Sequence, residues 1–197
     1  MSISAVNGRR TSLGAIVLGI VGALAMAAPA AADEGFRVSQ TCAGCHGTDG
    51  ASPGETIPIL GGQSAAYLAD SLRAYKNGDR DYYVMKIIAN GFDDDQIDAM
   101  SNWFASKPWV AAGGMVDTAM VANGKAVADD ACASCHGAAG EGTDVAPRLA
   151  GQPATYLTLA AQAYKSGARN HAAAAEALAD VSDADIEATS HYYASLR

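Results

Sequence analysis

Two short clusters of cysteine and histidine are the residues whose types and spacing could do chemistry. Both clusters read Cys-x-x-Cys-His, and their six reactive residues are Cys42, Cys45, His46, Cys132, Cys135 and His136. Two thiols three positions apart can form thioether bonds to the two vinyl groups of one porphyrin, and the adjacent histidine then supplies the proximal nitrogen to the iron. The pattern therefore predicts two covalently attached c-type haems, one at each cluster.

Other uses of the four cysteines fit the sequence less well. A zinc site would place the two Cys-x-x-Cys pairs about 15–20 residues apart, whereas 86 residues separate them here. A thioredoxin-like redox pair would need alternating strands and helices around it, and no such alternation is found. Structural disulfides are open to an exported protein, but they leave the histidine after each second cysteine unexplained.

The sixth iron ligand of the first haem has one good candidate. Met85 follows His46 by 39 residues and precedes the last helix expected in this half of the chain. A thioether sulfur at that position would complete His/Met ligation, stabilise Fe(II) and raise the reduction potential. The alternative is that Met85 is an ordinary core methionine.

The second half of the chain differs at this position. Its counterpart of Met85 is Ala174, which cannot bind iron. His171 lies three residues earlier and could give a His/His haem of lower potential. Alternatively, His171 faces solvent, and the iron is five-coordinate or bound by Lys165 or water. His191 lies on the expected last helix, and we expect it at the surface.

The chain repeats itself, which indicates two copies of one domain. The cysteine clusters recur at an offset of 90 residues, and residues 58–63 (PILGGQ) recur as residues 147–152 (PRLAGQ) at an offset of 89. The offset of 89 then holds to the end of the chain. One residue is therefore missing from the second copy between the counterparts of Gly47 and Pro58.

Each copy is expected to be all-α, because no segment shows convincing period-2 alternation. The expected second helices are Gln63–Lys76 and Gln152–Lys165, and the expected last helices are Asp94–Ser106 and Asp183–Leu196, with Asp and Ser at their starts as caps.

Pro108 and two glycines interrupt the helical pattern between the copies. We therefore expect one helical, haem-binding domain over residues 33–107, a linker over 108–117 and a second such domain over 118–197. Gly124 would let the first and last helices of the second domain approach closely; at an offset of 90 its counterpart is Glu34.

Residues 1–32 carry the pattern of a cleaved secretory signal peptide. Arg9 and Arg10 precede an uncharged apolar run from Leu13 to Ala28, and small residues follow up to Ala32. The run is shorter than the roughly 20 residues that span a bilayer. We therefore expect export to the periplasm with no stable membrane anchor after cleavage.

Composition limits the functions open to the chain. The net charge is −8, and removing residues 1–32, which hold two arginines and no acid, makes it −10. Such an acidic protein is a poor match for phosphate neutralisation, so no nucleic-acid partner is expected. Only 13 residues are aromatic, which predicts a thin core that two haems would help to fill.

With these features together, the chain resembles the two-haem class I cytochromes c, over nearly all of the mature sequence. Residues 149–152 (LAGQ) and 181–186 (VSDADI) resemble both cytochrome c4 and the cytochrome subunit of flavocytochrome c sulfide dehydrogenase. Residues 85–92 (MKIIANGF) and 117–120 (DTAM) are more similar to the sulfide dehydrogenase subunit. By this resemblance, the four cysteines hold haem, while His46, His136 and Met85 bind iron.

The resemblance implies electron transfer, most specifically as the subunit that accepts electrons from a sulfide-oxidising, FAD-containing flavoprotein. The alternative is a free cytochrome c4-type shuttle to a terminal oxidase or reductase. A third possibility, of another class, is catalysis or gas binding at an open second haem, because Ala174 vacates the ligand position. The chain lacks a substrate-activating constellation, so we do not expect it to be an enzyme on its own.

Overall fold

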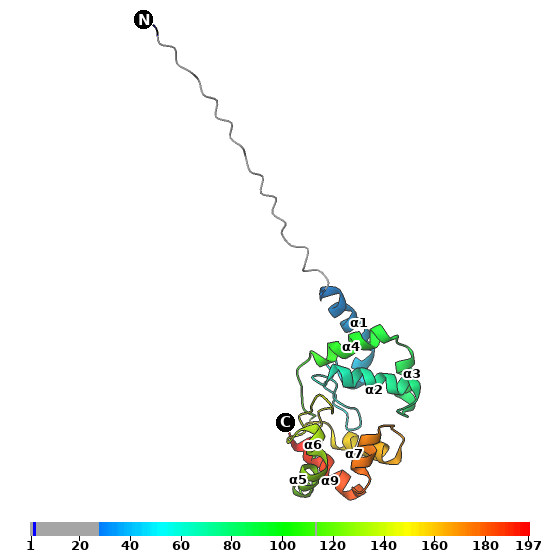
Figure 1. Cartoon of the computed structure of the whole chain (residues 1–197), viewed down its shortest axis with the longest axis vertical. Coiled ribbons are helices and arrows are strands. Elements are labelled where there is room, and N and C mark those ends of the chain that lie inside the picture. Colours follow the sequence, from blue (N-terminus) through cyan, green and yellow to red (C-terminus); the bar gives the residue numbers. More distant parts are fainter. Residues whose placement is uncertain (1, 3–27, 113) are drawn as a thin grey trace.

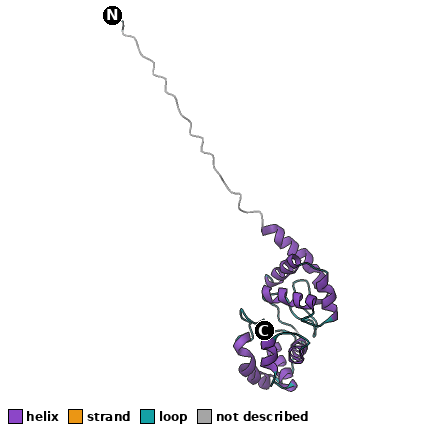
Figure 2. Cartoon of the chain, turned by 45° about the vertical axis from the view of Figure 1, so that its right-hand side comes forward, coloured by secondary structure: helices purple, strands orange, loops and turns teal. Residues whose placement is uncertain are grey.

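The computed structural model describes residue 2 and residues 28–112 and 114–197. These residues form two helical bodies, stacked one above the other in Figure 1. The described part of the chain contains helices and no strand, as Figure 2 also shows, which confirms the all-α prediction. The signal peptide expected at residues 1–32 lies almost wholly outside the described residues. Among those described, no helix is long and apolar enough to cross a membrane.

The two bodies repeat one arrangement of helices. The first contains α1 (Ala28–His46), α2 (Ala65–Asn77), α3 (Tyr83–Asn90) and α4 (Asp94–Ala105). The second contains α5 (Val121–Val127), the π-helix η1 (Ala128–Cys132), α6 (Ala133–His136), α7 (Ala154–Ser166), α8 (Ala172–Leu178) and α9 (Asp183–Ser195). In each body the first and last helices pack together, and the second helix packs against the last. The expected second and last helices therefore form within two residues of their expected bounds.

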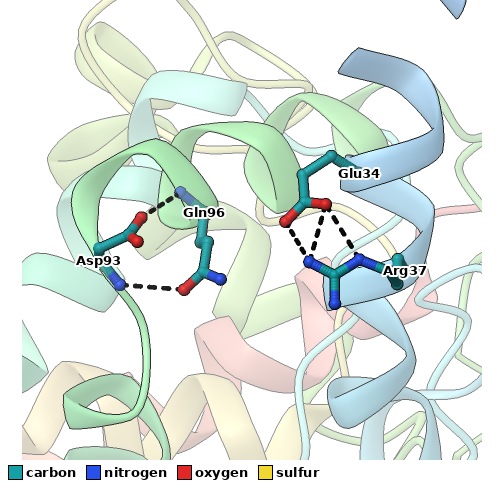
Figure 3. Close-up of polar contacts among 4 residues, drawn as sticks. All are labelled: Glu34, Arg37, Asp93 and Gln96. Carbon is teal, nitrogen blue, oxygen red and sulfur yellow. Dashed lines mark hydrogen bonds and ion pairs between the residues drawn. The ribbon is translucent and has the colours of Figure 1, made fainter. Parts of the chain in front are cut away.

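The last helices begin where their caps dictate. The Asp93 carboxylate accepts a hydrogen bond from the backbone N–H of Gln96, and the Gln96 side chain accepts one from the backbone N–H of Asp93. Figure 3 shows this capping box beside an exposed ion pair between Glu34 and Arg37 on α1. Ser182 caps α9 by accepting from the N–H of Asp185. These side chains satisfy N–H groups that a helix start leaves free.

The π-helix η1 explains a mismatch between the two copies. A Cβ at Gly35 would lie 2.7 Å from the carbonyl oxygen of Ala99, and Gly124 makes the same close approach to Ala188. Gly124 is therefore the counterpart of Gly35, and its alignment with Glu34 is wrong. The second copy has one more residue between this glycine and its first cysteine, and the wider turn of η1 accommodates it.

The two bodies are joined by matching contacts from equivalent residues. Gln152 accepts a hydrogen bond from the N–H of Ile59 (2.8 Å) and donates one to its carbonyl oxygen (2.9 Å). Gln63 does the same with the backbone of Arg148, at 3.1 and 3.0 Å. Both glutamine side chains are buried. A buried amide of this kind fixes its neighbour, because breaking the pair leaves polar groups without partners.

Candidate haem-binding sites

The cysteines stand at the ends of the helices that open each body. Cys42 and Cys45 lie in the last turn-and-a-half of α1, while Cys132 and Cys135 lie at the junction of η1 and α6. No disulfide joins any of these four cysteines. Burial, together with the neighbouring Cys45, raises the pKa of Cys42 to about 11. Within the described residues no three His, Cys, Asp or Glu side chains gather as a metal-ion site.

The two histidines are held in the same way in both bodies. His46 and His136 each place Nδ1 2.8 Å from a carbonyl oxygen, that of Pro58 and that of Pro147 respectively. Burial lowers the pKa of both imidazoles, although the backbone hydrogen bond opposes the shift. A neutral ring that donates Nδ1–H to a carbonyl keeps the lone pair of Nε2 free for a metal.

The proline carbonyls are functional groups that the sequence reasoning missed. Pro58 and Pro147 were visible as repeated residues, but their backbone oxygens carry no mark in the sequence that ties them to a histidine 11 or 12 positions earlier. Their role follows only from the loop that returns to the end of α1 or α6.

Met85 lies on the inner side of α3. It is half-buried, whereas Tyr83, Val84 and Ile87 on the same helix are exposed by 77%, 51% and 56%. A half-buried methionine between exposed neighbours is placed for a contact inside its own domain. In the second body Ala174 takes the same place, as the third residue of α8, and it too is half-buried.

The nitrogen-bearing side chains of the second body that the sequence singled out all have partners within the protein. The Nδ1 of His171 accepts a hydrogen bond from the N–H of Ala174 at 3.2 Å, so His171 is the N-cap of α8. The ammonium group of Lys165 donates to the carbonyl oxygen of Val181. His191 accepts from the N–H of Asp117 at 3.1 Å and is half-buried, so it ties the segment between the bodies to α9.

A cluster of arginine and tyrosine lies between the two bodies. As with the two glutamines, equivalent residues of the two bodies make equivalent contacts. Arg80 donates to the hydroxyl of Tyr156 (3.3 Å), and Arg169 donates to the hydroxyl of Tyr67 (3.2 Å). The two arginines also pair their backbones as an isolated antiparallel bridge. Each guanidinium stacks on a further tyrosine of its own body, 4.4 Å above Tyr75 and 4.3 Å above Tyr164.

This arginine–tyrosine cluster carries positive charge without a matching acid. Arg169 is only 7% exposed, and within the described residues neither Arg169 nor Arg80 has a carboxylate in ion-pair contact. Burial would raise the pKa of Tyr67, but Arg169 and Arg80 outweigh it and lower that pKa to about 7. Buried cations are normally paired. Haem carries propionate carboxylates, which could pair with these arginines. The cluster and the two histidines together therefore fit two haems.

Comparisons with known proteins agree with this geometry. The family model for cytochrome c matches residues 32–107 and 121–197. Cytochrome c4 of Pseudomonas aeruginosa is 32% identical over 92% of this chain and 95% of its own length. The thiosulfate dehydrogenase electron acceptor of Thiomonas intermedia is 32% identical over 79% of this chain and 76% of its own.

Two further similarities cover 40% and 84% of this chain. The cytochrome subunit of sulfide dehydrogenase from Chlorobaculum tepidum is 37% identical over 40% of this chain and 70% of its own. The crystal structure of reduced recombinant cytochrome c4 from Pseudomonas stutzeri superimposes with a TM-score of 0.78 at 28% identity, covering 84% of this chain and 98% of that chain.

Proposed function

Because this chain belongs to the cytochrome c family and carries two covalent c-type haems for electron transfer, we propose that it accepts electrons from a sulfur-oxidising dehydrogenase in the periplasm. The observation that carries the proposal is the repeated site: two attachment clusters, each with a carbonyl-oriented histidine, on two domains joined by one buried cationic cluster. The signal-peptide pattern of residues 1–32 supports the location.

The residues of the chain divide the work. The bound haem irons supply one-electron oxidation and reduction. Two cysteines would fix each macrocycle, and His46 and His136 would present Nε2 to the metal because Nδ1–H is committed to a proline carbonyl. In the first domain, Met85 is placed to offer its sulfur from α3. Its thioether would favour the reduced state of the iron, which would make this domain the electron-accepting end of the pair.

The arginine–tyrosine cluster would hold haem propionates from both domains. Arg80 and Arg169 each reach a tyrosine of the other domain, so one anion bound there contacts both halves. A positive charge at this point stabilises the carboxylates and resists loss of an electron from a nearby metal. The cluster therefore ties the reduction potentials of the two domains to each other.

Two classes of electron donor are candidates, and a different relative supports each of them. A sulfide-oxidising flavoprotein with FAD is the donor expected from the sequence, and the similarity to the sulfide dehydrogenase subunit supports it over 40% of this chain. A thiosulfate dehydrogenase is the second candidate, because that electron acceptor resembles both domains of this chain. We propose the flavoprotein as the first to test.

Stopped-flow reduction separates the donors. The oxidised dihaem protein is mixed with sulfide and a sulfide-oxidising flavoprotein or with thiosulfate and a thiosulfate dehydrogenase, and the haem absorbance is followed. Catalytic amounts of the true donor should reduce the protein rapidly, while substrate alone reduces it slowly. No acceleration by either enzyme would refute the proposal. Since the chain is acidic, a donor with a basic face should lose rate as salt rises.

Replacing Arg169 with glutamine should lower at least one of the two reduction potentials. Removing a buried positive charge costs the reduced state on the order of 1 kcal/mol at an effective dielectric near 20, and about 1.4 kcal/mol corresponds to about 60 mV for one electron. Spectroelectrochemical titration measures the shift. Arg73→Gln is the matched control, because Arg73 pairs with Asp98 at the surface and should leave both potentials unchanged.

A further inference from the structure

The two domains differ most at the inner side of their third helices. α3 and α8 follow N-cap residues with nearly the same extended backbone, φ −157° and ψ 107° at Tyr82 against φ −164° and ψ 102° at His171. Three residues after each cap stands the half-buried position, Met85 in one domain and Ala174 in the other. The helix is therefore kept in place while its sulfur ligand is lost.

The rest of α8 offers no replacement. Its first four residues are alanines, and they are followed by an exposed glutamate, a further alanine and Leu178. None of the inward positions Ala174, Ala175 and Leu178 carries a donor atom in its side chain. A ligand from the protein would have to come from a neighbouring nitrogen.

His171 is the nearest nitrogen donor, and its geometry is that of a cap. Its Nδ1 accepts a hydrogen bond from the N–H of Ala174, so a neutral ring carries its proton on Nε2 and has no lone pair there for a metal. The ring packs edge-on to Tyr164 with centroids 6.0 Å apart, and the side chain is exposed. The equivalent residue of the first domain, Tyr82, is also exposed, by 59%. The cap position thus points outward in both domains, while the inward position three residues later differs.

Lys165 is excluded as an iron ligand by comparison with its counterpart in the first domain. Its ammonium group donates to the carbonyl oxygen of Val181, and in the first domain Lys76 donates to the carbonyl oxygen of Phe92 at 2.7 Å. Both lysines therefore bind the loop before the last helix. A residue that has this structural task in the domain with Met85 has the same task in the domain without it.

From these placements we propose that the second haem has an open sixth position, and that it binds small external ligands with a free lone pair, of the kind represented by carbon monoxide. Ala174 is the residue that creates the space, since its methyl group replaces the longer Met side chain. The first domain stays closed because Met85 is present. The proposal rests on the two haems and is independent of which dehydrogenase donates the electrons.

Carbon monoxide titration of the reduced, full-length dihaem protein tests the proposal. We expect one carbon monoxide bound per chain, seen as a shift in the Soret band of half of the haem. Uptake by neither haem in the unaltered protein would overturn the proposal. The electron-transfer assay with dehydrogenases is separate, so its failure would leave this measurement valid.

Two substitutions on α8 sharpen the test. Ala174→Met should abolish carbon monoxide uptake and double the far-red charge-transfer absorbance of oxidised haem–methionine, because it restores the residue found in the first domain. Ala173→Met, at the exposed neighbouring position, is the matched control and should bind one carbon monoxide. His171→Ala should also keep an uptake of one. An uptake that arises only in His171→Ala would show that His171 is the ligand, and would overturn the proposal.

Discussion

A chain in which Cys132 and Cys135 are both replaced by serine is expected to retain one covalent haem instead of two. Each thioether bond needs one cysteine sulfur, and serine oxygen does not replace it, so the double substitution removes both bonds and haem at His136 would be held by coordination alone. The haem that remains after denaturation and acid–acetone extraction measures the outcome, because only thioether-linked haem survives this treatment. The intact mass of the chain should fall by one haem.

The reciprocal variant serves as the control. Replacing Cys42 and Cys45 with serine should also leave one covalent haem, now in the second domain. The unaltered protein should keep two through the same extraction. If it kept only one, or if all of its haem could be extracted, the assignment of both clusters would be refuted.

The replacement of Met85 by alanine is expected to lower the reduction potential of the first haem by on the order of 100 mV. Axial ligands set haem potentials over about 0.8 V, and a thioether sulfur stabilises Fe(II) more than nitrogen or water does. The far-red charge-transfer band of oxidised haem–methionine should disappear at the same time. A redox titration monitored by absorbance measures both effects in one sample.

Met100→Leu is the matched control for this substitution. Met100 is fully buried on α4, and leucine conserves most of its volume, so the cost to stability should stay below about 1.5 kcal/mol. Its far-red band and potential should match those of the unaltered protein. If the far-red band is unchanged in Met85→Ala, Met85 is not an iron ligand and is a core residue instead.

The sequence predicted the local features of this protein well. The bounds of α4 and α9 follow from Asp93 and Ser182, whose side chains cap helix N–H groups within three residues. The attachment clusters consist of residues close together in the sequence, and the internal repeat is visible because the same residue types recur at a fixed offset. Information of this kind lies in short segments, so pattern and propensity suffice to find it.

The contacts between domains could not be predicted from the sequence, because they join residues far apart along the chain. Gln152 meets Ile59 across 93 positions, and Arg169 meets Tyr67 across 102. The repeat marked these residues as equivalent to one another but not as neighbours, because equivalence says nothing about how two copies face each other. The extra residue accommodated by η1 was hidden too, since a single inserted residue looks the same in a helix and in a loop.

The paired glutamines and arginines between the domains also bear on how such a chain arose. Each residue meets the other domain as its counterpart does, which is the isologous pattern of a twofold homodimer. A single-domain ancestor with these residues would have paired with a second copy of itself. Joining the copies in one chain makes that pairing independent of concentration and lets the halves diverge. In this chain the halves differ at the position that holds Met85 in one and Ala174 in the other.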